Sequence, residues 1–95
     1  MVVIGSLDSK QRAELRSRAH KLKPAQHVGK DGVTEAVLSS VDEALNTRDL
    51  LKIRFLDNAP GSPREMAEEI AAARDNVQVV QVVGRVAVLY RPLEK

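Results

Sequence analysis

The chain has 95 residues, enough for a single domain with a modest core, and its 43% hydrophobic and 29% charged residues are typical of a globular protein. It contains no cysteine, which excludes disulfides, zinc–thiolate sites, iron–sulfur clusters and thiol catalysis. One Phe, one Tyr and no Trp argue against nucleic-acid modules that stack bases on aromatic platforms.

The formal net charge of +2 is distributed unevenly along the chain. Residues 1–30 carry seven basic and two acidic side chains, whereas residues 31–95 carry eight basic and eleven acidic ones. A basic first third favours a polyanionic partner, and a solvated basic helix is the alternative that charge alone leaves open.

The first helix is predicted over residues 9–22. Asp8 is its expected N-cap, with Gln11 as the capping-box partner three residues later. Its buried stripe follows a helical spacing and consists of Leu15, Ala19 and Leu22. Pro24 disfavours a helical conformation at the residue before it and therefore ends the helix.

A short strand over residues 25–28, a loop over residues 29–32 and a second helix over residues 34–46 are expected next. Asp31 or Thr34 caps this helix, and the sequence leaves both open. Residues 50–56 follow as a strand in which apolar residues alternate with Lys52 and Arg54. These two basic residues are predicted to be exposed on one face of the sheet.

Ser62, Pro63 and Glu65 predict the start of a third helix, which stops near residues 74–76. Strands over residues 77–83 and 86–91 close the chain, and Gly84 suits the first central position of a type II′ turn between them. The predicted fold is a two-layer α/β sandwich with the order α-β-α-β-α-β-β and a mixed four-stranded sheet, forming one domain over residues 1–95.

The sequence does not indicate an enzyme. No nucleophile motif lies beside His20 or His27, and the neighbouring carboxylates of Asp42 and Glu43 point in different directions on a helix. Two histidines without thiols are too few for a metal site. We therefore expect no catalytic role, no metal and no cofactor, and we interpret the histidines as partly exposed packing residues.

The beginning of the chain has a short apolar run without a basic leader, and no segment approaches the ~20 apolar residues of a membrane span. We therefore expect a monomeric cytoplasmic protein without a membrane partner.

The loop Gly29-Lys30-Asp31-Gly32 between a strand and a helix is the most informative motif. Two glycines three residues apart permit positive φ and remove Cβ atoms, so that a sugar-phosphate backbone can approach closely. The following helix N-terminus favours phosphate, which is the physical basis of the GXXG loop of KH domains. A tight strand-to-helix turn is the alternative interpretation. Asp31 either caps the second helix or weakens phosphate binding by this loop.

The chain also contains an ordered set of short motifs. They are Leu7 with Lys10, Gln11 and Leu15; Ala19 and His20 with residues 22–24; and residues 28–32, 34–38, 42–45, 50–53, 81–85 and 88–92. Together they resemble the bacterial single-domain CRM proteins, the YhbY-like RNA-binding family, over about residues 7–92.

The resemblance implies a mixed four-stranded sheet with three helices, similar to the C-terminal domain of bacterial translation initiation factor three. It also implies RNA binding through basic surface residues and the glycine loop. Bacterial members of the family are associated with precursors of the large ribosomal subunit, and plant relatives with intron splicing.

We predict a distributed RNA-binding surface whose members are basic or form the glycine loop. They are Arg12, Arg16, Lys21 and Lys23 from the first helix, Gly29, Lys30 and Gly32 from the loop, and Lys52, Arg54, Arg85 and Arg91 as secondary candidates. For Lys52 and Arg54, an ordinary solvated sheet edge is an equal alternative.

Our first hypothesis is a non-catalytic protein that binds precursor ribosomal RNA, and hence ribosomal particles, in large-subunit assembly. The second is a protein-interaction adaptor whose basic helix docks on an acidic ribosomal or translation-factor surface. The third and weakest is a small hydrolase that depends on His20 or His27.

Overall fold

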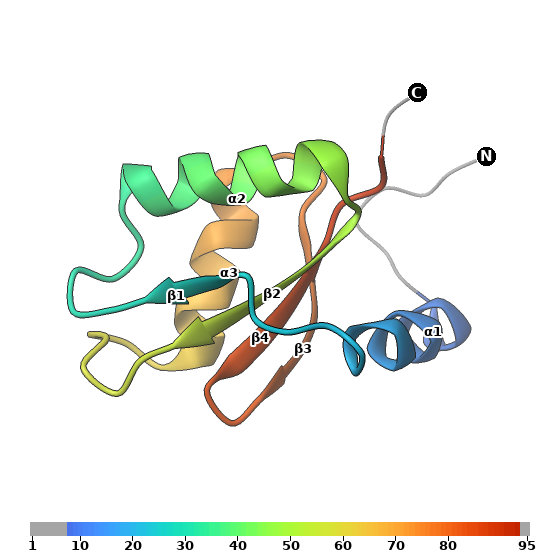
Figure 1. Cartoon of the computed structure of the whole chain (residues 1–95), viewed down its shortest axis with the longest axis horizontal. Helices are drawn as coiled ribbons and strands as arrows, with labels where there is room; N and C mark the ends of the chain where they lie inside the picture. Colours follow the sequence, from blue (N-terminus) through green and yellow to red (C-terminus); the bar gives the residue numbers. More distant parts are fainter. Residues whose placement is uncertain (1–7, 94–95) are drawn as a thin grey trace.

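The computed structural model describes residues 8–93 (Figure 1). The elements in chain order are α1 (Ser9–Ala19), β1 (Gln26–Val28), α2 (Glu35–Thr47), β2 (Leu50–Phe55), α3 (Pro63–Ala73), β3 (Gln78–Val83) and β4 (Val86–Tyr90). The predicted order of helices and strands is confirmed.

The strands form one mixed four-stranded sheet in the order β1-β2-β4-β3, as predicted. β1 and β2 are parallel and are connected through α2, whereas β4 is antiparallel to both β2 and β3. Gly84 opens the β3–β4 turn with a φ of +58°. Within residues 8–93, Asn76 is the only non-glycine residue with a positive φ, so the φ of Arg85 is not positive. A positive φ at the first central residue and not at the second agrees with the predicted type II′ turn.

The main core lies between one face of the sheet and the helices α2 and α3. Leu51, Ile53 and Phe55 alternate along β2 and are completely buried. Their helical neighbours in this core are Leu38, Val41 and Leu45 of α2 and Met66, Ala67 and Ile70 of α3. This core fixes the orientation of β2, so that its other residues face the opposite side of the sheet.

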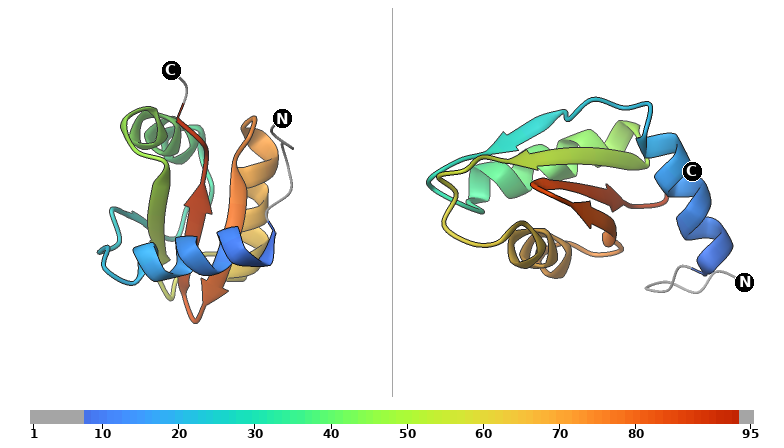
Figure 2. Two further views of the ribbon diagram at one scale, coloured as in Figure 1. Left: turned by 90° about the vertical axis from the view of Figure 1, so that its right-hand side faces the viewer. Right: turned by 90° about the horizontal axis from the view of Figure 1, so that it is seen from below.

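The opposite face is covered by α1 at one end of the sheet only (Figure 2). Leu15 and Ala19 of α1 are buried there against Leu50, Val80 and Val88 from three of the strands. Because the buried residues of α1 are Leu15 and Ala19, one turn apart, the helix covers only part of this face. The two-layer sandwich therefore carries a partial third layer beside an uncovered stretch of sheet.

α1 ends at Ala19, three residues before the predicted end at Leu22. The N–H groups of Lys21 and Leu22 donate to the carbonyls of Arg18 and Ala19, which is the tighter three-residue spacing of a 3₁₀ turn. The helix therefore tightens before Pro24 instead of continuing, and residues 20–25 lead the chain to β1.

The helix starts follow the predicted capping chemistry. Asp8 and Gln11 form a capping box at α1, and Ser62 and Glu65 form another at α3. At α2, the Thr34 hydroxyl accepts the N–H of Val37 at 3.2 Å, so Thr34 is the cap. Asp31 is therefore free of that role.

Candidate nucleic-acid interface

The predicted basic residues divide into two groups according to what their side chains contact. Those in the first group are half-buried and hydrogen-bonded within the fold. They are Arg12, Lys52, Arg85 and Arg91.

Arg12 fastens α1 to an irregularity in β3. The register between β3 and β4 shifts between Val79 and Gln81, so Val80 is an extra residue on β3. Nη1 of Arg12 donates to the carbonyl oxygens of Val79 at 3.1 Å and of Val80 at 2.6 Å. Such a bulge disrupts the regular strand pairing, and the guanidinium supplies a donor at this point.

Lys52 is half-buried, which corrects the prediction that it is exposed. Its Nζ donates to the carbonyls of Ala19 and Leu22, each at 3.2 Å. The last carbonyls of a helix lack intrahelical partners and carry partial negative charge, so a lysine is a favourable neighbour there. The alternation along β2 placed Lys52 on the correct face, but α1 packs beside it on that face.

Arg85 ties the β3–β4 turn to the end of β2. Its Nε donates to the carbonyl of Phe55 at 2.8 Å and its Nη2 donates to that of Leu56 at 2.7 Å. The N–H of Phe55 donates in return to the carbonyl of Arg85 at 2.7 Å. Asp57 lies 3.4 Å from the same Nε and neutralises part of its charge.

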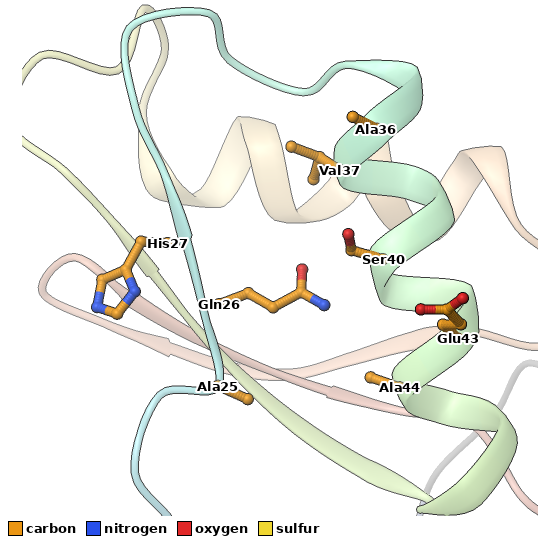
Figure 3. Close-up of a pocket in the computed structure, with 8 residues that line it drawn as sticks. All are labelled: Ala25, Gln26, His27, Ala36, Val37, Ser40, Glu43 and Ala44. Atoms are coloured by element: carbon orange, nitrogen blue, oxygen red, sulfur yellow. The ribbon is translucent and has the colours of Figure 1, made fainter.

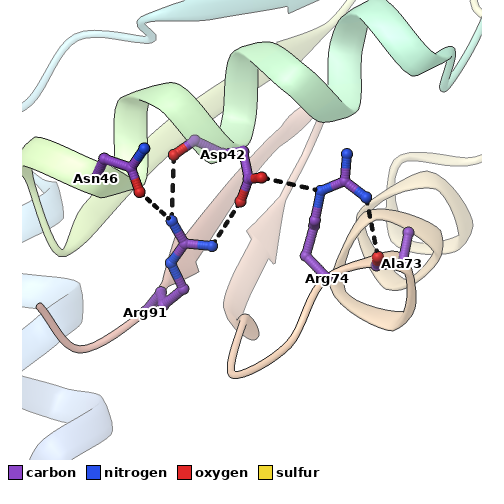
Figure 4. A network of polar contacts seen from close by, with 5 residues as sticks. All are labelled: Asp42, Asn46, Ala73, Arg74 and Arg91. Carbon is purple, nitrogen blue, oxygen red and sulfur yellow. Dashed lines mark hydrogen bonds and ion pairs between the residues drawn. The ribbon is translucent and has the colours of Figure 1, made fainter. Parts of the chain in front are cut away.

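Arg91 is held in a polar network, and its side chain is 17% exposed. Its guanidinium donates to the carboxylate of Asp42 at 2.7 Å and to Oδ1 of Asn46 at 3.1 Å (Figure 4). Arg74 approaches the other oxygen of Asp42 to 3.4 Å. The network links the chain after β4 to α2 and to the end of α3.

Arg18, which was not predicted to bind RNA, is exposed but is also hydrogen-bonded within the fold. Its guanidinium makes two hydrogen bonds, at 2.6 and 3.1 Å, to the carboxylate of Asp49. These hydrogen bonds hold the pKa of Asp49 below its ordinary value and raise the pKa of Arg18, against the opposing effect of partial burial.

The residues of the second group are exposed, and their side chains make no hydrogen bond or ion pair with any residue in the range 8–93. They are Arg16, Lys21, Lys23, Lys30 and Arg54. We refer to these residues as the free cations. Each can bind a phosphate without giving up a contact that holds the fold together.

Arg16 faces away from the ion pair of Arg18. The two side chains are about 200° apart around the helix axis, because each residue turns the helix by about 100°. Arg18 points to Asp49, which precedes β2, so Arg16 lies on the opposite flank of α1. That flank borders the uncovered part of the sheet.

The two glycines of the loop have different structural roles. Gly32 has a φ of +68°, its N–H donates to the carbonyl of Gly29 at 3.0 Å, and a Cβ there would lie 2.8 Å from Cγ of Pro60. At Gly29 a Cβ would make only ordinary contacts, the closest at 3.7 Å to Leu56. Only Gly32 is required by the turn itself.

The tip of the loop is accessible. Lys30 and Asp31 are both exposed, and neither has a hydrogen bond or ion pair inside the described part of the chain. The loop lies at one end of β1, and α1 lies beyond the other end (Figure 1). The two predicted parts of the interface, adjacent in sequence, are thus separated by the length of β1.

A shallow groove lies between β1 and α2 (Figure 3). Gln26 points into it toward Ser40 and Glu43, whereas the His27 ring points to the opposite side of β1. The groove therefore does not combine a hydroxyl with an imidazole. His20 and His27 are both exposed.

Within residues 8–93, no group of three His, Asp or Glu side chains is arranged to hold a metal ion. None of the helices in the same range is long and apolar enough to cross a bilayer.

The chain matches one protein family over most of its length. Residues 7–91 match the CRS1 / YhbY (CRM) domain. "Probable RNA-binding protein YqeI" of Bacillus subtilis is 38% identical over 85 residues, covering 90% of this chain and 88% of that protein. A Haemophilus influenzae protein named "RNA-binding protein" is 36% identical over 93 residues, covering 95% and 90% of the two chains.

A solved structure shows the same fold. The solution structure of SAV1595 from Staphylococcus aureus has a TM-score of 0.79 and 34% sequence identity, and the match covers 95% of this chain and 93% of that one. With the domain match and the two relatives, this confirms the resemblance seen in the sequence motifs. The chain belongs to the CRS1 / YhbY (CRM) domain family.

Proposed function

We propose that this protein is a non-catalytic RNA-binding protein that acts on precursor RNA of the large ribosomal subunit. The observation that carries the proposal is the set of free cations, which have no partner among the described residues. The relatives named as RNA-binding proteins support RNA as the polyanion.

The free cations supply affinity through phosphate contacts. Each lysine or arginine that neutralises a phosphate releases counterions, so the affinity falls as the salt concentration rises. If about five phosphates are neutralised on a single strand, the slope of log K against log salt is near −3.5. The half-buried group adds little to this slope, because these side chains already serve acceptors within the protein.

The loop contributes a close approach to the RNA backbone. A Cβ at Gly29 would make only ordinary contacts, so the turn itself does not require glycine there. The lack of a side chain at this position instead allows a sugar-phosphate chain to approach the backbone closely. Lys30 supplies the positive charge at the tip, and the exposed carboxylate of Asp31 opposes it. We expect this loop to bind one phosphate through Lys30 rather than to form a strongly basic clamp.

Crosslinking of the protein to RNA in cells, followed by sequencing of the bound fragments, tests the assembly role. We expect enrichment of large-subunit precursor RNA. An even distribution over cellular RNAs contradicts the assembly role.

Co-sedimentation with ribosomal particles tests whether RNA or protein is the partner. Nuclease treatment releases an RNA-binding protein from the particles. Retention of the protein after nuclease treatment contradicts RNA as the partner and assigns the basic helix to a protein surface.

A further inference from the structure

The uncovered part of the sheet connects the two separated groups of free cations. Lys23 precedes β1 and Lys30 follows it, a span of seven residues or at most about 23 Å of extended chain. The β1 residue between them that faces away from α2 is His27 (Figure 3). A strand of RNA held by both lysines therefore runs past His27 and its neighbours on the sheet.

Those neighbours form one row across all four strands. His27 of β1 is paired with Arg54 of β2, Arg54 with Val86 of β4, and Val86 with Val83 of β3. Residues paired in this way point to the same face of a sheet. We call these residues the open row.

The side chains of the open row are accessible. Val83 is 62% exposed, His27 and Arg54 are exposed, and Val86 is half-exposed. α1 covers the row containing Leu50 instead, farther along the strands. The open row thus combines two planar groups that carry hydrogen-bond donors with two exposed aliphatic side chains.

This composition matches an unpaired base better than it matches a phosphate. Single-stranded RNA presents bases that stack on the planes of histidine rings and arginine guanidinium groups. Duplex RNA keeps its bases stacked inside the helix and offers its backbone and groove edges. The only Tyr and the only Phe are half-buried and buried, so stacking on the open row falls to His27 and Arg54.

We propose that the open row binds unpaired bases of single-stranded RNA whose phosphates are held by Lys23 and Lys30 at the two ends of β1. The proposal rests on the proposed function and adds a selectivity for single strands over duplexes. Charge complementarity identifies the occupant, because cations without internal partners flank the row at both ends of β1.

The substitution Arg54→Lys separates stacking from charge, since lysine keeps the positive charge and lacks the planar guanidinium. The assay measures fluorescence anisotropy of a labelled twelve-nucleotide single strand and of a blunt duplex that contains the same strand. Stacking of one base on a side chain is worth a factor of about five or more in affinity. We expect Arg54→Lys to weaken single-strand binding about fivefold, with an unchanged salt slope and an unchanged affinity for the duplex.

Arg64→Lys is the matched control, because Arg64 is exposed on α3 behind the sheet. It is expected to leave both affinities unchanged. Equal binding by Arg54→Lys and the unchanged protein overturns the open row as a base site, and so does an equal loss for strand and duplex.

Nuclear magnetic resonance reports stacking on His27 directly in the unmodified protein. The ring protons of His27 are expected to shift upfield when the single strand is added, and those of the exposed His20 outside the row are expected to move less. Binding of the strand without a shift at His27 overturns the proposal.

Failure of the base site is distinguishable from failure of RNA binding itself. If Lys23→Ala and Lys30→Ala flatten the salt slope while Arg54→Lys changes nothing, RNA binding stands and the base site is refuted. If the unchanged protein binds neither oligonucleotide, both proposals fail. A concentration-dependent dimer that Val83→Asp disrupts assigns the row to a second copy of the chain and overturns the base site.

Discussion

Two arginines that the sequence analysis assigned to the RNA-binding surface, Arg91 and Arg54, lie in opposite environments. After β4, Arg91 is enclosed by Asp42 and Asn46 and fastens this part of the chain to α2. Beside β1, Arg54 is exposed and contacts no acceptor in the described chain. A count of basic residues therefore overestimates a candidate RNA interface, because a guanidinium that already serves internal acceptors is part of the fold.

The largest expected effect comes from breaking the Arg91 network. We expect Arg91→Ala to lower the free energy of unfolding by about 2 kcal/mol, because hydrogen bonds to a charged group are lost together and Asp42 keeps only Arg74 nearby. Thermal unfolding followed by circular dichroism should show a melting temperature lower by roughly 8–16 °C.

Arg54→Ala is the matched variant on the other side of the comparison. It should change stability by less than about 0.5 kcal/mol, as exposed substitutions do. The comparison is wrong if Arg91→Ala leaves the melting temperature unchanged while RNA affinity drops, since Arg91 would then act in binding.

The two glycines of the loop are also expected to differ, one in stability and the other in RNA binding. Gly32→Ala places a Cβ at a positive φ and against Pro60, so we expect a loss of about 1–2 kcal/mol in stability. Gly29→Ala should fold like the unchanged protein, and any loss of RNA affinity in it reports the close approach of the RNA backbone. Urea unfolding and oligonucleotide binding measure the two effects, and equal stability of both variants contradicts this division.

Replacing one free cation by alanine is expected to lower the RNA affinity modestly and to leave the free energy of unfolding unchanged. Lys23→Ala or Lys30→Ala should each weaken binding about fivefold at ~0.1 M salt and flatten the salt slope by about 0.7 for a single strand. Anisotropy titrations over a range of salt concentrations measure this. A variant that loses affinity equally at all salt concentrations shows that its lysine does not contact phosphate.

The smallest expected effect concerns the ion pair of Arg18 and Asp49. Since folding lowers the pKa of Asp49, the pair stabilises the protein above the ordinary value of 3.8, and this is lost as the pH falls through the lower folded value. The pair is partly exposed, so we expect Asp49→Asn to cost about 0.5 kcal/mol near pH 7. The difference from the unchanged protein should shrink in urea unfolding below pH 3.8. A difference that is independent of pH contradicts the ion pair as its cause.

Local chemistry made the fold predictable from the sequence. The capping residues Asp8 and Ser62 and the alternation along β2 act over a few residues, so the sequence displays them directly. The early end of α1 was not predictable, because its last carbonyls bind Lys52, thirty or more residues away in the chain.

The division of the basic residues was not predictable for the same reason. Arg91 lies 49 residues from Asp42, and Arg18 lies 31 residues from Asp49, so no sequence spacing reveals these pairs. Nor does sequence order show that Lys23 and Lys30 lie at opposite ends of an exposed strip of sheet. The residue types of the candidate interface were evident in the sequence, whereas the availability of their side chains depends on tertiary contacts.

The salt dependence of binding to a single-stranded oligonucleotide tests whether the free cations, and not the arginines held within the fold, contact the RNA phosphates. For the unchanged protein we expect a slope of log K against log salt near −3.5. The slope should be less steep, about −2, for the double variant Lys23→Ala/Lys30→Ala. Arg91→Ala should keep the original slope, because the Arg91 guanidinium already serves Asp42 and Asn46. A binding that does not depend on salt, or a slope that Arg91→Ala flattens as much as the double variant does, would contradict the account.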